Sequence, residues 1–376
     1  MWSIILKKRN ELILTAGPSI TEKEISYVHD AIQNGWNEHW NDYIIKFEKK
    51  FATYLEVKHA LTTSSCTGAM HLGLKSMGLG VEDEVILPEI TWVATASVIT
   101  YVNATPIFVD IDPETWCIDP KSIQNAITSK TKAIMPVHLY GHPANMGEII
   151  EIAEKNNLVI LEDAAQSIGT TLNKKKTGSF GNASAFSFQG AKILSTGEGG
   201  MFLTNDTELF EKVSKLGDHG RSLTKSLWND EIGFKYKMSN LQAAMGLAQL
   251  ERIEELIEKK RTIYRWYCER LNHIIDISLN VEKNNCRNIF WMTTIVLGKK
   301  IKITRNQFMQ KLKQWNVDSR PVFYPISHMP MFKTKHNPNA EFFSKNGINL
   351  PSGHNLTEDD VEYVCNIIKL ILSDTI

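Results

Sequence analysis

Apolar residues follow two different periods along the chain. In some segments they recur three or four positions apart, which places them on one face of an α-helix. Residues 42–55 are an example, with Ile44, Ile45, Phe47 and Phe51 as the apolar stripe. Other segments are short, continuous apolar runs, which are typical of strands buried on both faces of a parallel sheet. The pattern therefore predicts both helices and strands.

These two patterns alternate, which predicts an α/β fold with a mostly parallel sheet. Thr21 and Glu24 form a capping box that starts the first helix, and this helix stops at Gly35. Predicted strands occupy residues 84–87, 106–109, 132–137, 158–161, 184–188 and 200–203. Predicted helices occupy residues 22–34, 42–55, 70–77, 91–102, 120–128, 146–156 and 207–216.

The pattern changes in the last third of the chain. A single long helix is predicted over residues 238–271, and long helices of this kind often bridge two domains. Beyond it we expect a strand at 290–297 and a final helix at 358–371. The predicted domains are residues 1–250, a large α/β domain that includes the N-terminal helices, and residues 251–376, the connecting helix with a small α+β domain. Because no low-complexity linker separates them, the two domains should pack tightly.

Composition narrows the class of protein. At 376 residues and 42.7 kDa the chain can bury a large core. Lys and Arg together number 42, as do Asp and Glu, so no net charge attracts nucleic acid or a membrane. The five cysteines form no CxxC pair, which argues for a reducing compartment and against a structural metal. Positive charge follows the apolar N-terminal residues, unlike in a signal peptide, and no apolar run reaches membrane-spanning length. We therefore expect a cytoplasmic protein.

Candidate chemistry lies just past the ends of two predicted strands. Asp163 follows the run 158–161, and Lys192 follows a second strand that ends near Ser187. Ligands of α/β sheets collect beyond the carboxyl ends of the strands. Lys192 has apolar neighbours, which lower the pKa of its amine and free the lone pair for attack on a carbonyl. A carboxylate, a hydroxyl and such a lysine are the groups needed to hold pyridoxal 5'-phosphate (PLP).

Two further segments fit the same cofactor. The turn Ser65-Cys66-Thr67 feeds a helix N-terminus, where free backbone N–H groups make an anion site for the PLP phosphate. The alternative is an ordinary helix cap, and the lysine pattern favours the phosphate site. Trp92 follows a strand end, where its flat face could stack on the pyridine ring. The alternative for Trp92 is a helix-start tryptophan packed into the core.

Three motifs carry a family resemblance. They are residues 162–167 (EDAAQS), residues 186–188 (FSF) with Lys192, and residues 196–200 (TGEGG). This pattern resembles the DegT/StrS-type aminotransferases, PLP enzymes of fold type I that mostly aminate keto sugars attached to nucleotides. The resemblance runs from about Leu14 to the C-terminus. It implies a large domain with a mostly parallel, seven-stranded type of sheet and a smaller C-terminal α+β domain.

The resemblance assigns roles to individual residues. Lys192 would form the Schiff base with PLP and then move a proton between the substrate and the cofactor. Asp163 would keep the pyridine nitrogen protonated, and Gln166 would lie near the phenolic oxygen. Ser187 and the 65–67 turn would share the phosphate. Because dehydratase relatives carry a histidine in place of this lysine, Lys192 points to amino transfer.

Two departures from the family pattern bear on the phosphate and the substrate. The family builds its active site across a homodimer, and the segment from the second subunit is here residues 233–238. Relatives commonly have asparagine and arginine where this chain has Lys235 and Lys237. Either a lysine contacts the phosphate, or the asparagine's role is lost, or both lysines form a solvated pair. A Ser/Thr-Gly stretch that lines the substrate pocket is replaced here by bulkier residues that include His39 and Trp40.

Near the C-terminus, Arg320 and His328 resemble residues of the family's segment that faces the substrate or the donor. An arginine suits a carboxylate or a phosphate, although Arg320 could equally form a structural ion pair. His328 stands where relatives also carry a histidine.

The resulting hypothesis is a homodimeric aminotransferase that takes its amino group from glutamate or glutamine. The expected acceptor is a nucleotide-linked 3- or 4-keto-6-deoxy sugar for surface polysaccharide. One alternative is a smaller phosphorylated ketone as acceptor, suggested by the bulkier 37–41 segment and the extra lysines. Another is a PLP-binding regulatory protein without turnover, against which intact Lys192 and Asp163 count.

Overall fold

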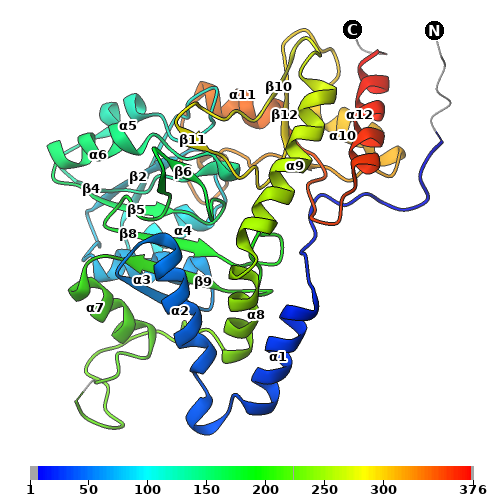
Figure 1. Cartoon of the computed structure of the whole chain (residues 1–376). Helices are drawn as coiled ribbons and strands as arrows, with labels where there is room; N and C mark the ends of the chain where they lie inside the picture. The colour runs from blue at the N-terminus through cyan, green and yellow to red at the C-terminus, as the bar shows by residue number, and fades with distance from the viewer. Residues whose placement is uncertain (1–6, 223, 374–376) are drawn as a thin grey trace.

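A seven-stranded sheet forms the centre of the computed structural model, which describes residues 7–222 and 224–373. The strand order is β1-β9-β8-β5-β4-β2-β3, and only β9 runs antiparallel to its neighbours. The predicted α/β fold with a mostly parallel sheet is thus confirmed (Figure 1). The signal-peptide argument rests largely on residues 1–6, which lie outside the described residues.

The sheet strands are β1 (His59–Thr63), β2 (Glu84–Pro88), β3 (Thr105–Val109), β4 (Thr131–Ile134), β5 (Val159–Asp163), β8 (Ala183–Ser187) and β9 (Gly200–Thr204). Five predicted strands are confirmed within a few residues. The strand predicted at 132–137 ends earlier, at Ile134. The sequence analysis missed β1, which lies at the sheet edge and pairs only with β9.

The helices of this part are α1 (Glu22–Asn34), α2 (Asp42–Leu55), α3 (Cys66–Ser76), α4 (Ala94–Tyr101), α5 (Pro120–Ala126), α6 (Met146–Lys155) and α7 (Thr207–Gly217). The capping box of Thr21 and Glu24 is confirmed. Helix α3 begins before the predicted residue 70, because the Ser65 side chain caps it by accepting from the Gly68 N–H (3.0 Å). The predicted stripe of α2 is wrong at Ile45, which is 54% exposed because it lies one position off the buried face.

Two apolar cores cover the two faces of the sheet. One packs α2, α5 and α6 against strand residues that include Phe186 and Met201. The other packs α3, α4 and α7 against alternate residues of the same strands, including Ala185 and Phe202. Successive side chains of these strands thus point alternately into the two cores, as expected for strands that are buried on both faces. Helices therefore cover both faces of the sheet, and the carboxyl ends of the parallel strands lie together at one of its edges.

The long helix predicted over residues 238–271 is in fact two helices. They are α8 (Asn240–Leu250) and α9 (Ile253–Leu271), with a break at Glu251 and Arg252. The Arg252 guanidinium bonds the Glu24 carboxylate of α1 at 2.7 Å, which holds the chain at the break. Helix α9 then runs toward the C-terminal part of the chain (Figure 1). The domain division at residue 250 stays a prediction.

The C-terminal part contains a four-stranded antiparallel sheet, in the order β10-β12-β14-β13. Its elements are β10 (Ile277–Leu279), β12 (Thr294–Leu297), β13 (Arg320–Pro321), β14 (Gly347–Asn349), α10 (Arg305–Gln314), α11 (Pro338–Asn346) and α12 (Glu358–Ser373). The final helix is confirmed, but the strand predicted at 290–297 begins only at Thr294. Phe290 has a φ of 49°, which no strand residue adopts.

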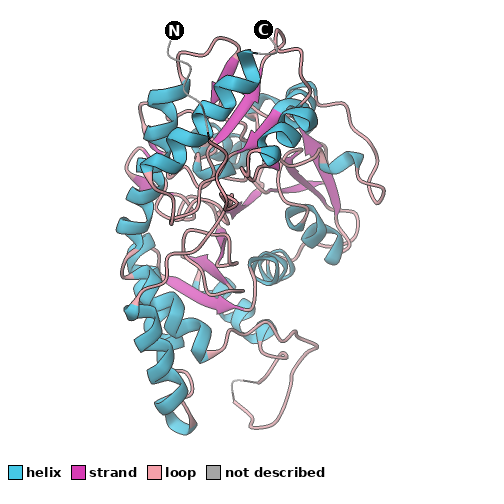
Figure 2. Ribbon diagram, turned by 90° about the vertical axis from the view of Figure 1, so that its right-hand side faces the viewer, coloured by secondary structure: helices cyan, strands magenta, loops and turns pink. Residues whose placement is uncertain are grey.

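Short elements complete the described chain. They are β6 (Thr171–Leu172), β7 (Lys175–Lys176), β11 (Cys286–Arg287), and the 3₁₀ turns η1 (Asn37–His39), η2 (Leu139–Gly141) and η3 (Ile326–His328). Strand β11 pairs with β6, which links the C-terminal part to the loops above the large sheet. Figure 2 shows the segment between α7 and α8 as a long loop that projects from the body. Within the described ranges, no helix combines the length and apolarity needed to cross a bilayer.

Candidate active site

Asp163 is the last residue of β5, in the middle of the large sheet. Its carboxylate is buried and held at both oxygens. Oδ1 accepts from the Ala165 N–H at 3.1 Å, and Oδ2 accepts from the Thr95 hydroxyl at 2.7 Å. Each oxygen keeps lone-pair capacity for a further donor. The sheet thus presents a fixed carboxylate at the carboxyl end of its central strands.

Lys192 lies in the turn that joins β8 to β9. The backbone of this turn is closed by bonds from Lys192 N to Gln189 O and from Thr196 N to Phe188 O, both 2.8 Å. The amine of Lys192 lies 3.8 Å from the centroid of the Trp291 ring. Burial lowers the pKa of Lys192 to about 8, although the Asp163 carboxylate and the Cys66 thiol act in the opposite direction. An amine with this pKa is partly neutral, and therefore nucleophilic, near pH 7 to 8.

The N-terminus of α3 lies against β9. A Cβ placed on Gly200 would lie 2.5 Å from the Cys66 nitrogen, so no larger residue fits in this position. Ser65 uses its hydroxyl to cap Gly68, so its side chain is occupied. The N–H groups of Cys66 and Thr67, in the first turn of α3, stay available to an anion. Burial raises the pKa of the Cys66 thiol well above its usual value, so this thiol is neutral.

Gln166 lies one turn beyond Asp163, and its side chain is held in one orientation. Its Oε1 accepts from the Tyr140 N–H at 2.9 Å. The amide nitrogen is therefore the end that can donate to a ligand oxygen. Gln166, Ser187, Lys192 and Trp291 line one small cavity. The structure thus brings three of the predicted site residues together.

Aromatic rings connect Lys192 to Trp92. Trp291 lies 6.0 Å from Tyr140, Tyr140 stacks on Phe323 at 5.5 Å, and Phe323 lies 6.3 Å from Trp92, measured between ring centroids. Trp92 is 63% exposed, which contradicts the alternative that it packs into the core. Its ring face stays available for stacking.

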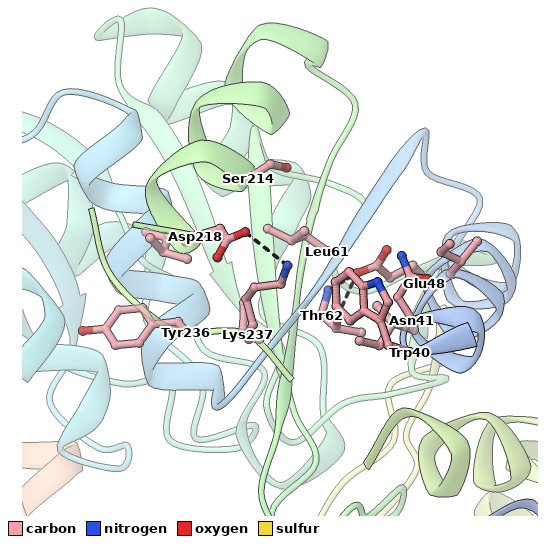
Figure 3. Close-up of a pocket in the computed structure, with 14 residues that line it drawn as sticks. Trp40, Asn41, Glu48, Leu61, Thr62, Ser214, Asp218, Tyr236 and Lys237 are labelled. Carbon is pink, nitrogen blue, oxygen red and sulfur yellow. Dashed lines mark hydrogen bonds and ion pairs between the residues drawn. The ribbon is translucent and has the colours of Figure 1, made fainter. Parts of the chain in front are cut away.

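Lys235 and Lys237 do not join this cavity in the single chain. Their amines pair with the two oxygens of Asp218, at 3.1 and 3.3 Å. The Lys237 amine also lies 5.1 Å from the ring of Trp40. Figure 3 shows Lys237 directed toward Asp218, with Trp40 and Glu48 across the same pocket of about 230 Å³. Two residues predicted from distant segments, Trp40 and Lys237, thus meet in a pocket that neither Lys192 nor Asp163 lines.

The three other predicted substrate residues are exposed. His39 pairs with Asp42 at 3.0 Å. His328 lies 3.3 Å from the carbonyl of Lys335. Arg320 is the first residue of β13, opposite Asn349 of β14. None of the three lines the cavity at Lys192.

Sequence reasoning missed three residues of this site. Thr95 binds Asp163, Tyr140 binds Gln166, and Trp291 contacts Lys192. A hydroxyl one turn after Trp92 was a signal that could have found Thr95. Tyr140 and Trp291 lie in segments without a motif, and only tertiary contacts bring them to the site.

These groups fit PLP. The fixed Asp163 carboxylate suits a protonated pyridine nitrogen, the Lys192 amine suits the aldehyde, and the α3 N-terminus beside Gly200 suits the phosphate. When bound, PLP supplies the electron sink that amino transfer needs. The fold and this site together define the class of fold type I PLP enzymes.

Comparison with known proteins identifies the family within that class. The model of the DegT/DnrJ/EryC1/StrS aminotransferase family matches residues 18–369, so the chain belongs to this family. The chain is 41% identical to GDP-perosamine synthase of Escherichia coli O157:H7 over 361 residues, which cover 95% of this chain and 98% of the relative. It is 40% identical to GDP-perosamine synthase of Caulobacter vibrioides, with coverage of 96% and 98%.

A solved structure supports the cofactor. Spr1654 from Streptococcus pneumoniae matches with a TM-score of 0.91 at 26% identity, over 96% of this chain and 98% of the other, in its PMP form. Its PLP form matches with the same TM-score. The protein is therefore a PLP-dependent aminotransferase, and the alternative of a non-catalytic regulator is not favoured.

Proposed function

We propose that the protein moves an amino group from glutamate or glutamine to a 3- or 4-keto-6-deoxy sugar carried on a nucleoside diphosphate. GDP is the nucleotide to test first. The observation that carries this proposal is the near-complete alignment with two GDP-perosamine synthases at 40–41% identity, in a chain whose Lys192 amine has a pKa lowered by burial and interacts electrostatically with the Asp163 carboxylate. The product would enter surface polysaccharide, and the reaction would take place in the cytoplasm.

Five residues at or near the cavity have a task in this proposal: Lys192, Asp163, Thr95, Gln166 and Trp92. Lys192 carries the amine that bonds the cofactor and, once released, takes a proton from the donor's Cα. Burial keeps part of this amine neutral near pH 8, which both tasks need. Asp163 would keep the pyridine nitrogen protonated, and Thr95 fixes its carboxylate. The amide N–H of Gln166 would donate to the phenolic oxygen of the cofactor, and Trp92 would stack on its ring.

The phosphate would be held by the N–H groups of Cys66 and Thr67, together with the hydroxyls of Thr67 and Ser187. A homodimer would add Lys235 or Lys237 of the second subunit. In the single chain both amines pair with one carboxylate, that of Asp218. One amine can therefore move to the phosphate while the other still neutralises the Asp218 carboxylate. Trp40, whose ring lies 5.1 Å from the Lys237 amine, and the neighbouring His39 would contact the acceptor.

The small phosphorylated ketone is not favoured as acceptor. It was suggested by the bulk of residues 37–41, but the relatives that align along the whole chain are named for a nucleotide-linked sugar. Arg320 and His328 stay proposals for the acceptor or donor side, since both are exposed.

The test is a two-stage absorbance experiment on the PLP-loaded protein. Glutamate or glutamine should bleach the band of the bound cofactor, and one GDP-linked keto sugar should restore it, with release of the aminated sugar. Lys192→Ala is the control and should show neither change. Restoration by a small phosphorylated ketone and by no nucleotide sugar would refute the proposal.

A further inference from the structure

Trp291 occupies a position that the roles described above do not explain. Its ring lies under the Lys192 amine, with 3.8 Å between the nitrogen and the ring centroid. The tryptophan is 7% exposed and lines the same cavity as Lys192, Gln166 and Ser187. A cation directly over the face of an indole is attracted by the negative face of the ring, most strongly where water is excluded.

The ring is fixed from several sides. Its Nε1 donates to the Ala191 carbonyl at 2.8 Å, directly beside Lys192. Its backbone N–H donates to the Tyr140 carbonyl at 3.0 Å, and the Tyr140 N–H in turn donates to Gln166. The indole face is therefore held in place for Lys192, and its orientation is tied to that of Gln166.

We propose that Trp291 is a positioning residue that keeps the Lys192 amine over its ring face, beside the cofactor site, whenever this amine is not bonded to the cofactor, and that it stabilises the ammonium formed once Lys192 has taken up a proton. The inference rests on the aminotransferase function of this site but not on the identity of the sugar. Lys192 must leave the cofactor when a substrate amine replaces it and must stay within reach to move a proton. A rigid ring face keeps it there with a weaker attraction than a directly paired carboxylate would exert on the ammonium.

The electrostatic effect has a definite sign. Burial lowers the pKa of Lys192, and a cation–π contact opposes burial by favouring the ammonium. A contact of ordinary strength is expected to raise the pKa of the amine by roughly 0.5–1 units. Removal of the ring alone should therefore lower it.

The experiment compares Trp291→Phe with Trp291→Leu. Both lack the indole N–H and leave voids of similar size, so the difference between them isolates the ring face. The rate at which cofactor-free protein forms the coloured species with PLP is measured as a function of pH. The pH at the midpoint of this curve gives the pKa of the Lys192 amine. Trp291→Leu should have a midpoint roughly 0.5–1 pH units below that of Trp291→Phe. Trp116→Leu, at a buried tryptophan that stacks on Phe343 and does not line this cavity, should lower thermal stability but keep the wild-type midpoint.

Equal midpoints in the two Trp291 variants would overturn the inference while leaving the aminotransferase intact. Absence of colour in wild-type protein would overturn both. If Trp291→Leu does not fold, the wild-type protein gives a second measurement. Protonation of Lys192 should change the tryptophan fluorescence with a midpoint near pH 8, and this transition should vanish in Lys192→Met. A transition that persists in Lys192→Met would refute the contact.

Discussion

Glu162 and Asp163 are neighbours on β5, yet their carboxylates have opposite tasks. Glu162 is fully buried and accepts from three backbone N–H groups, those of Gly178, Phe180 and Gly181, at 2.7–2.8 Å. Its Oε2 also lies 2.9 Å from His138 Nε2. Since His138 Nδ1 accepts from the Ala144 N–H, Nε2 carries the proton and donates to Glu162. Glu162 thus anchors the loop before β8, which leaves Asp163 as the carboxylate for chemistry.

Glu162→Gln should therefore destabilise the protein without removing a catalytic group. An amide places two N–H donors where only acceptors are wanted, which costs about 2–4 kcal/mol of unfolding free energy. Chemical denaturation of the cofactor-free protein measures this loss. Glu154→Gln, on the exposed side of α6, should change stability by less than about 0.5 kcal/mol. Equal stability of the Glu162 variant and the wild type would show that the four hydrogen bonds to Glu162 contribute nothing to the free energy of unfolding.

Thr95→Val tests how firmly Asp163 must be held. Valine matches threonine in shape but removes the hydroxyl that donates to Asp163 Oδ2 at 2.7 Å. A lost hydrogen bond to a charged group corresponds to about 1.5–3 kcal/mol, so PLP affinity and kcat should together fall roughly 10–100-fold. Ser97→Ala, whose hydroxyl donates to the backbone of the same helix, should behave as wild type. Unchanged affinity and rate in Thr95→Val would mean that the sheet alone fixes Asp163.

Among the residues of the site, the sequence alone identifies those that belong to a motif. Lys192, Asp163 and Gln166 could be found because they stand in motifs that resemble those of the family. Thr95, Tyr140 and Trp291 could not, because each reaches the site by a contact between segments far apart in sequence. Such contacts depend on how whole elements pack, which no short pattern encodes.

Elements were predicted well where both faces of a strand or one clear face of a helix is buried. The edge strand β1 was missed because its short run, residues 59–63, carries polar threonines and pairs on one side only. The break between α8 and α9 was missed because no proline or glycine causes it. Arg252 and Glu251 instead bind groups on α1 and α2, including Glu24 and Lys50.

Helix α9 carries a lysine that is buried and forms no ion pair with a carboxylate within residues 7–222 and 224–373. Lys260 is 2% exposed, and its amine donates to the Ser352 carbonyl. Burial lowers the pKa of Lys260 from 10.5 to about 7. The folded protein therefore binds fewer protons than the unfolded chain between pH 10.5 and 7. Its stability falls as the pH falls through this window and is constant below it, with a total change of about 5 kcal/mol at most.

Lys260→Met should remove this pH dependence. The substitution is expected to raise the free energy of unfolding by about 2–3 kcal/mol more at pH 6 than at pH 9, as measured by chemical denaturation at both pH values. Lys259→Met is the matched control, since its partly exposed amine also donates to a carbonyl, that of Leu356. An identical effect of Lys260→Met at both pH values would contradict the low pKa.

At the scale of the whole molecule, the loop between α7 and α8 exposes several large apolar side chains. Leu227 is 98% exposed and Ile232 is 95% exposed, and Trp228 between them is half-exposed. This loop leads directly into residues 233–238, the segment proposed to reach a second subunit. Apolar residues at full exposure are typical of surfaces that a partner covers. We expect this loop to lie in the interface of the proposed homodimer.

Charging the loop should therefore separate the subunits. Leu227→Glu combined with Ile232→Glu should shift the mass measured by light scattering from dimer toward monomer and lower the activity in parallel, because each proposed site needs the second chain. Val81→Glu, at a 71% exposed residue between α3 and β2, should leave both unchanged. A wild-type protein that is monomeric and active would contradict the shared site.

The pairing of β1 with β9 also limits when the chain can acquire its cofactor during folding. It joins His59 to Thr204 and Thr63 to Gly200, so a strand made early in synthesis waits for one made much later. Closing so large a loop is slow, because its entropy must be lost before the new contacts form. The α3 N-terminus comes directly after β1 and lies against Gly200. A nascent chain that ends before β9 therefore lacks Gly200 beside the α3 N-terminus and has no complete phosphate site. Binding of PLP would thus show that β1 has paired with β9 and that the large sheet is complete.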